Sequence, residues 1–204
     1  MTLPRRVVLD VSLLPRTVFG VRDMMWWGTL AFVIVEGFSL VLTVAVSLYL
    51  RKNFATWPPE DILLPSVVAP TIQMVLMLVS LPVIRRLSQR SMDFEVHPVR
   101  RLLTIAALFT ITFVALRAWE LTQSLNVRWD ANAYGSAQWL VVGSHALLLA
   151  VQSVETIGMA LIFWRGPVEK KHFSDASDIA FYWYFIVLSW LPLYLLAFWL
   201  PRWI

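Results

Sequence analysis

The sequence predicts an all-α integral membrane protein built as a bundle of five transmembrane helices. Of its 204 residues, 59% are hydrophobic and only 15% are charged. The charged residues gather in short blocks between long apolar runs. A helix needs about 20 mainly apolar residues to cross roughly 30 Å of hydrocarbon, and five runs reach or approach that length. The expected spans are about 25–50, 62–84, 102–121, 137–164 and 179–200.

Aromatic residues and prolines add detail to individual spans. Trp26 and Trp27 open the first span, as expected of anchors at the membrane interface. The second span contains Pro65 and Pro70 near its start and Pro82 near its end, which predicts a kinked helix. The last span is rich in Trp and Tyr. Its central Trp190 is expected to pack on another helix or on a lipid tail.

The connections between the spans are too short to hold a soluble domain. We therefore expect two regions, a cytoplasmic N-terminal segment over 1–24 and a single five-helix domain over 25–204. The first region carries four arginines but has no compact apolar core or cleavage site, so it does not resemble a secretory signal peptide.

Basic residues predict the orientation, because short cytoplasmic loops retain Lys and Arg. The N-terminal segment and the second and fourth connections hold twelve of the 17 basic residues, whereas the opposite side holds four. The N-terminus is therefore expected in the cytoplasm and the C-terminus on the exterior. This topology accounts for the net charge of +4, and no nucleic-acid partner is expected.

The composition also argues against a redox centre in this chain. Cysteine is absent, and His145 is the one histidine of three that falls within a span. Haem in a helix bundle takes axial ligands from the protein, and copper sites need several soft or imidazole ligands. We expect no catalytic residue, no cofactor-binding residue and no metal ligand here.

Glu36 is the first candidate functional residue, because it lies near the middle of the first span. An acidic residue at the centre of a membrane helix costs about 2.5–3.5 kcal/mol unless it is protonated or finds a partner. Three interpretations stay open. Glu36 forms a structural hydrogen bond between helices, has a proton-linked or lipid-linked role, or faces lipid without a role.

Four further ionisable residues fall within the spans. Arg117 and Glu120 are three residues apart on one helix and are expected to pair near its exterior end, where arginine can snorkel to the interface. His145 is expected to be a packing or hydrogen-bonding residue rather than a ligand. Glu155 and the nearby Gln152 suggest a local polar patch rather than an ion path.

Several local sequences, taken in order, resemble subunit III of the haem-copper oxidases in its short bacterial form with five spans. The stretch from Trp27 to Glu36 is similar to the family pattern W-x-x-x-F-I-x-x-E, and Trp57 with the two following prolines resembles the next loop. Further similar positions are Glu120 after Trp119, His145 after Gly143-Ser144, and Tyr182-Trp183-Tyr184-Phe185 leading to Trp190.

The chain departs from that family pattern at four polar positions. Arg117 replaces a glutamine, Leu148 and Tyr184 replace histidines, and Val187 replaces an aspartate. The resemblance therefore indicates a diverged member whose internal polar network has been rebuilt, with Arg117 and Glu155 as candidate replacements.

The resemblance implies a non-catalytic subunit of a terminal respiratory oxidase in the bacterial inner membrane. Such a subunit docks beside the haem- and copper-bearing subunit I, binds phospholipid, and supports proton uptake and durability of the enzyme. Oxygen reduction and proton translocation belong to the complex, and haem and copper are expected in partner subunits. Two alternatives stay open, an accessory subunit of nitric oxide reductase and an independent ion or proton transporter.

Overall fold

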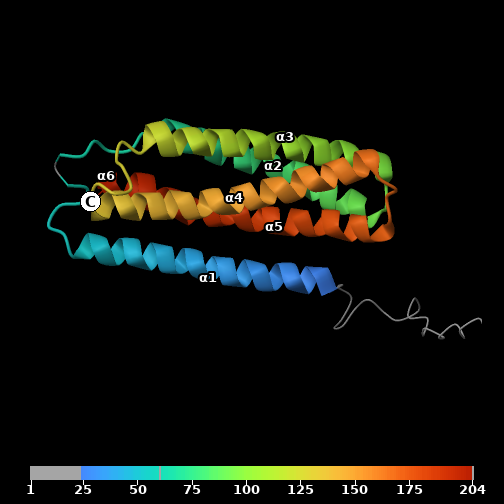
Figure 1. The fold of residues 1–204 in the computed structure, drawn as a ribbon, viewed down its shortest axis with the longest axis horizontal. Helices are drawn as coiled ribbons and strands as arrows, with labels where there is room; N and C mark the ends of the chain where they lie inside the picture. The colour runs from blue at the N-terminus through green and yellow to red at the C-terminus, as the bar shows by residue number, and fades with distance from the viewer. Residues whose placement is uncertain (1–23, 60, 204) are drawn as a thin grey trace, which may run out of the picture.

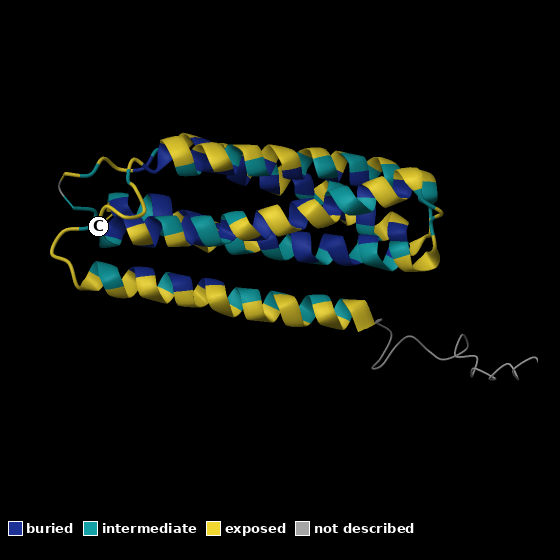
Figure 2. Ribbon diagram, viewed as in Figure 1, coloured by how far each residue is buried: buried dark blue, intermediate teal, exposed yellow. Residues whose placement is uncertain are grey.

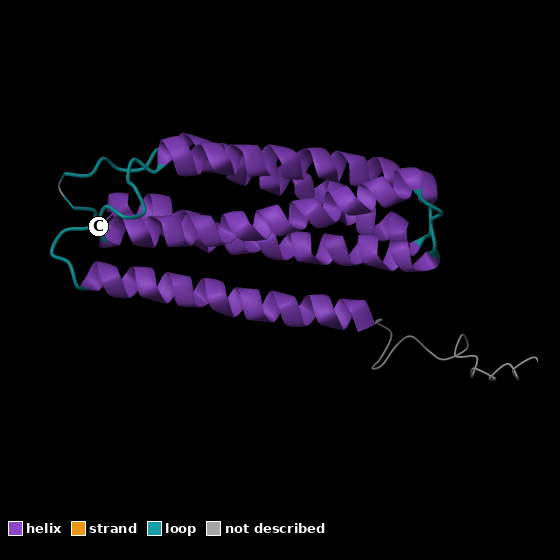
Figure 3. Cartoon of the chain, in the orientation of Figure 1, coloured by secondary structure: helices purple, strands orange, loops and turns teal. Residues whose placement is uncertain are grey.

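The computed structural model describes residues 24–59 and 61–203, and the described part is helical, without a strand (Figure 3). The expected cytoplasmic segment over 1–24 lies almost wholly outside the described residues. Five long helices follow in order, with π turns named η1 and η2 extending α3 and α5. The bounds are α1 Met24–Lys52, α2 Val68–Met92, α3 Val96–Trp119, η1 Glu120–Ser124, α4 Ala133–Arg165, α5 Lys170–Tyr194, η2 Leu195–Trp199 and α6 Leu200–Trp203.

Within the described residues, five helical segments are long and apolar enough to cross a membrane, which confirms the predicted class and number of spans. The second helix is shifted along the chain from the expected range 62–84, since α2 begins at Val68 and ends at Met92. Pro65 lies before the helix. Pro70 lies in its first turn, where a missing N–H removes no intrahelical hydrogen bond. Pro65 and Pro70 therefore mark the beginning of the helix and do not kink it.

The other helices extend past their predicted ends, because hydropathy marks the stretch inside hydrocarbon and not the end of the helix. The largest extension is in the last segment, where α5 begins at Lys170 instead of residue 179. The polar stretch 170–178 is thus the first part of a helix. This places Asp175 and Asp178 on the bundle rather than in a loop.

Helices α2 to α5 form the packed core, and α1 lies at its side against α4 and α5 (Figure 1). Within α1 only Leu40, Thr43 and Ser47 are buried, and most of its surface is exposed apolar side chain (Figure 2). A helix that is apolar all round suits hydrocarbon surroundings. By contrast, nearly all of the largest fully buried side chains come from α2 to α5 and η2, among them Met77, Phe113, Phe163, Trp190 and Phe198.

The connections alternate between the two ends of the bundle. The loops α1–α2 and η1–α4 and the C-terminal region lie at one end, and the loops α2–α3 and α4–α5 lie at the other (Figure 1). The end holding α2–α3 and α4–α5 carries most of the described basic residues, in agreement with the count made from the sequence. Which end faces the cytoplasm stays a prediction.

The end of the last span is closed by hydrogen bonds from other elements. Pro201 has no N–H for the carbonyl of Ala197 four residues earlier, and the Gln138 amide of α4 donates to that carbonyl at 2.7 Å. Arg202 donates to the carbonyls of Phe198 and Pro65. These contacts join α4, η2, α6 and the loop before α2.

The loop before α4 is held tightly at Gly135. Asn132 caps α4 by accepting a hydrogen bond from the Gly135 N–H at 2.8 Å. A Cβ atom at Gly135 would lie 2.3 Å from the carbonyl oxygen of Arg128, so the loop and helix can approach only because this residue is glycine. Arg128 also donates twice to Asp130, which lowers the pKa of that exposed carboxyl.

Candidate functional site

A charged pair is buried in the core near the end of the bundle that holds the C-terminus. The inward face of α3 recurs every three or four residues, and that face carries Phe113, Arg117 and then Glu120 at the start of η1. Nη1 of Arg117 donates to Oε2 of Glu120 at 2.6 Å. The side chains are 2% and 1% exposed, so the pair is enclosed by protein.

Two residues from neighbouring helices complete this cluster. The Arg117 guanidinium lies over the ring of Trp190 in α5, with Cζ 3.6 Å from the ring centroid. Its Nη2 lies 3.3 Å from Nδ1 of His145 in α4, whose Nε2 lies 3.0 Å from the carbonyl oxygen of Ile186. Because guanidinium is always a donor and a carbonyl always an acceptor, Nδ1 accepts and Nε2 carries the proton. We call Arg117, Glu120, His145 and Trp190 the buried ionic cluster.

The structure corrects one part of the sequence interpretation and confirms two others. The Arg117–Glu120 pair forms as predicted, but Arg117 points into the core and does not snorkel, because Trp190 and His145 offer it polar and aromatic partners there. His145 is a satisfied hydrogen-bonding residue as expected. Trp190 was expected to pack on a helix or on a lipid tail. It packs on Arg117 and His145 inside the bundle, so its surroundings are protein.

The second polar site joins α1 to α5. The Tyr182 hydroxyl donates to Oε2 of Glu36 at 2.5 Å, and Phe32 on α1 stacks near the Tyr182 ring with centroids 6.1 Å apart. The hydrogen bond between helices, one of the interpretations left open for Glu36, is therefore present. It gives the loosely packed α1 a specific polar contact with the core.

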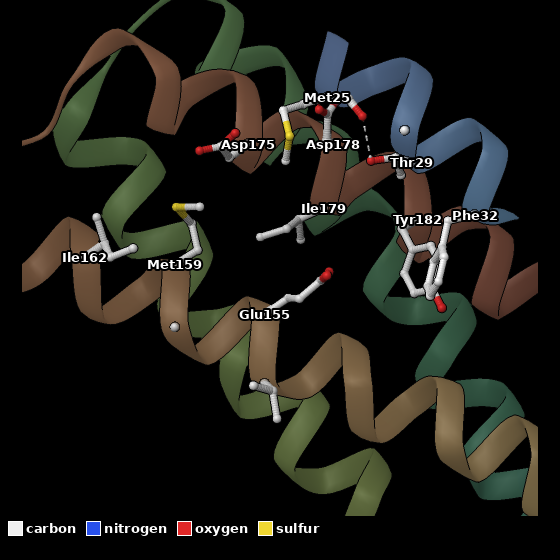
Figure 4. A pocket seen from close by; sticks show the side chains of 13 residues that line it. Met25, Thr29, Phe32, Glu155, Met159, Ile162, Asp175, Asp178, Ile179 and Tyr182 are labelled. Carbon is white, nitrogen blue, oxygen red and sulfur yellow. Dashed lines mark hydrogen bonds between the residues drawn. The ribbon is translucent and has the colours of Figure 1, made fainter.

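A cavity of about 560 Å³ lies beside this contact, between α1, α4 and α5 (Figure 4). Tyr182 forms part of its wall, so the residue that donates to Glu36 also lines the cavity. Apolar side chains supply most of the lining, and three carboxyl groups join them. The side chains labelled in Figure 4 are Met25, Thr29, Phe32, Glu155, Met159, Ile162, Asp175, Asp178, Ile179 and Tyr182.

Glu155 belongs to this cavity and not to the buried ionic cluster. It is exposed on α4, whereas Gln152 on the preceding turn is buried and donates to Thr156 at 2.9 Å. Gln152 is buried in the bundle, whereas Glu155, three residues further on, lines the cavity, and the polar patch expected of the two residues stays a prediction. The cavity itself is not predictable from hydropathy, because the polar residues 170–178 fall outside the expected span.

The remaining family-motif aromatics have separate structural partners. The Trp183 indole donates to Oγ of Ser80 in α2 at 2.9 Å, which ties α5 to the core. Trp57 in the loop after α1 meets the ring of Tyr134 edge-on, with centroids 5.1 Å apart. Leu148 and Val187, where the family pattern is polar, are buried among apolar side chains.

Within residues 24–59 and 61–203, no group of three or more His, Cys, Asp or Glu side chains is arranged to hold a metal ion. His145 has both ring nitrogens engaged in hydrogen bonds. The expectation that this chain binds no haem or copper stays a prediction.

The fold and these two sites define a polytopic helical membrane protein whose polar residues hold helices together. Comparison with known families is more specific. The family described as Cytochrome c oxidase subunit III matches residues 3–202, nearly the whole chain, and the chain belongs to that family.

Similar curated proteins agree. The chain is 22% identical over 187 residues to cytochrome c oxidase subunit 3 of Synechocystis sp., covering 88% of this chain and 77% of that protein. It is 24% identical over 202 residues to the protein of the same name from Petromyzon marinus, covering 96% and 77%. It is 23% identical over 192 residues to cytochrome c oxidase subunit 3 of Drosophila yakuba, covering 89% of this chain and 71% of that protein. The resemblance drawn from the local sequences is confirmed.

Proposed function

We propose that this protein is a non-catalytic subunit of a terminal respiratory haem-copper oxidase in a bacterial inner membrane. It docks beside the subunit that carries haem and copper, holds phospholipid against its bundle, and supports proton uptake and durability of the complex. The observation that carries the proposal is the family match over residues 3–202. Electron transfer, oxygen reduction and proton translocation belong to the assembled enzyme.

The cavity beside α1 supports the lipid-binding part of the proposal. Its apolar walls suit acyl chains, and Thr29, Asp175 and Asp178 supply polar groups toward the end of the bundle that holds the α4–α5 loop. An amphipathic ligand fits such a lining better than a small polar substrate does. The Glu36–Tyr182 hydrogen bond would keep α1 in place while the cavity is filled.

A cavity-filling variant tests this use of the cavity. Gly158 lines it, and a Cβ atom placed there meets nothing within 4 Å. Gly158→Phe is therefore expected to fill the cavity and displace lipid, whereas Gly143→Phe on the same helix is the matched control, because its Cβ is equally unhindered and it is not part of the lining. Lipid mass spectrometry of the purified complex should show loss of bound phospholipid in the first variant only. Equal lipid content in both variants would contradict the role given to the cavity.

Purification from native membranes in mild detergent tests the wider proposal. Co-purifying haem, seen in a visible redox difference spectrum together with a subunit I, is the expected result. The haem types and partner sequences would separate oxidases from the nitric oxide reductase branch. A colourless chain that reproducibly arrives alone and moves protons in liposomes would replace the proposal with an independent transporter.

A further inference from the structure

A second cavity, of about 440 Å³, lies at the C-terminal end of α1, where the helix passes into the loop before α2. This is the end of the bundle opposite to the α4–α5 loop (Figure 1). Its wall combines two adjacent basic side chains of the last helical turn with apolar and aromatic side chains of the helix and the loop. We call it the basic cavity, and its lining residues are Leu48, Arg51, Lys52, Phe54, Ala55 and Trp57.

Hydrogen bonds and ring contacts hold the wall of the basic cavity in place. Nδ2 of Asn53 donates to the carbonyl of Tyr49 at 2.8 Å, and the Phe54 N–H donates to the carbonyl of Arg51 at 3.3 Å. The rings of Phe54 and Trp57 lie with centroids 5.9 Å apart, and Trp57 packs edge-on against α4. The turn after α1 therefore keeps two aromatic side chains beside the two cations.

The positive charges of the basic cavity are not neutralised by the described part of the chain. Among the described residues, neither the Arg51 nor the Lys52 side chain has a partner in a hydrogen bond or an ion pair. At the same end of the bundle, Arg128 pairs with Asp130, and Arg202 donates to two backbone carbonyls. This is the end predicted to be exterior, where membrane proteins retain few basic residues, so topology does not account for the adjacent pair.

The surroundings of the basic cavity match those of a lipid headgroup. Tryptophan favours the headgroup level of a bilayer, so Trp57 indicates the depth at which lipid phosphates lie. An apolar stripe continues from the cavity along α1, because Leu48, Val41 and Ile34 are seven residues apart on one helical face and all three are exposed. A ligand with an anionic head and an acyl chain would meet matching groups along its length.

We propose that the basic cavity binds the headgroup of an anionic phospholipid such as phosphatidylglycerol. The phosphate accepts hydrogen bonds from the guanidinium of Arg51 and the ammonium of Lys52, and its acyl chain follows the stripe below Leu48. The lining has no carboxyl group, so the ammonium of phosphatidylethanolamine would find no acidic partner there. A headgroup with net negative charge is favoured over a zwitterionic one.

This inference needs only that α1 crosses a membrane. It does not rest on the lipid role proposed for the cavity between α1, α4 and α5, whose lining shares no residue with the basic cavity. Gly158→Phe should therefore leave binding at the basic cavity unchanged, and the two lipid proposals can fail separately.

Native mass spectrometry of the purified protein, with whichever subunits accompany it, tests the site. The delipidated protein is titrated with dioleoyl-phosphatidylglycerol or dioleoyl-phosphatidylethanolamine, and we expect tighter binding of the first. Arg51→Gln combined with Lys52→Gln should weaken phosphatidylglycerol binding about thirtyfold, since each basic side chain near a charged headgroup contributes a factor of roughly five. Binding of phosphatidylethanolamine should stay unchanged.

A second double variant controls for general attraction between a cationic protein and an anionic lipid. Arg85→Gln combined with Arg86→Gln removes two adjacent exposed charges from α2 at the other end of the bundle, and it should retain the preference for phosphatidylglycerol. Equal losses in the two double variants would overturn the site. Equal binding of the two lipids by the wild type would also overturn it, as would displacement of phosphatidylglycerol by inorganic phosphate, which would identify a site for free anions.

Discussion

Replacement of Arg117 by leucine should destabilise the protein strongly, because it removes the cation that pairs with Glu120 while the carboxyl stays enclosed. Arg117→Leu also removes the contact with the Trp190 ring and leaves Nδ1 of His145 without its donor. The variant therefore disturbs every member of the buried ionic cluster.

The size of the effect follows from the burial of the pair. Breaking a buried ion pair by removing one partner costs about 3–5 kcal/mol. Protonation of Glu120 would recover part of this, so we expect a loss of about 3 kcal/mol in the free energy of unfolding, or roughly a hundredfold in the folding equilibrium. Replacing both partners together is often neutral. Arg117→Leu combined with Glu120→Leu should therefore be more stable than Arg117→Leu alone.

Unfolding of the purified protein in mixed micelles, with yield of the assembled complex as a second readout, measures these differences. Arg128→Leu is the matched control, since Arg128 pairs with Asp130 but is 79% exposed, and such pairs contribute about 0–1 kcal/mol. The reasoning fails if Arg117→Leu is no more destabilising than Arg128→Leu, or if the double replacement adds the two single losses instead of offsetting them.

Two further predictions concern the loop before α4 and the contact of α1. Gly135→Ala should destabilise by about 1–3 kcal/mol through overpacking against the Arg128 carbonyl, whereas Gly143→Ala, whose Cβ meets nothing within 4 Å, should have little effect in thermal denaturation. Tyr182→Phe should loosen α1, because it removes the hydroxyl that donates a hydrogen bond to Glu36. The expected loss of stability is about 1.5–3 kcal/mol if the carboxyl is ionised and about 1 kcal/mol if it is protonated. Hydrogen exchange along α1 measures this, and unchanged exchange would show that packing alone holds the helix.

The class of the fold and the number of spans could be predicted from hydropathy, because a membrane helix must satisfy its backbone internally and needs a long apolar stretch. The helix ends could not be predicted in this way. Residues 85–92 and 170–178 are polar yet helical, since an α-helix continues outside hydrocarbon wherever nothing breaks it. Pro65 marks the start of α2 by position, but hydropathy alone placed it inside the span.

The pairing of Arg117 with Glu120 could be predicted from spacing along one helix, because residues three apart share a face. The direction in which the pair points could not be predicted. Whether that face points to the interface or to the core depends on Trp190 and His145, which come from helices whose neighbours the sequence does not specify. The cavity escaped prediction for the same reason, since three helices must meet before Glu155, Asp175 and Tyr182 line one space.

The two polar sites differ in access, and this difference separates their roles. The buried ionic cluster is enclosed by protein, so neither lipid nor bulk solvent reaches its residues. Their contacts hold α3, α4 and α5 together. Glu36 accepts a hydrogen bond from Tyr182, which lines a cavity large enough for a ligand. A carboxyl with one hydroxyl partner and an adjoining cavity can respond to what fills that cavity, whereas Glu120 is fixed by Arg117. Between Glu36 and Glu120, Glu36 is therefore the one whose substitution should change lipid content before it changes assembly.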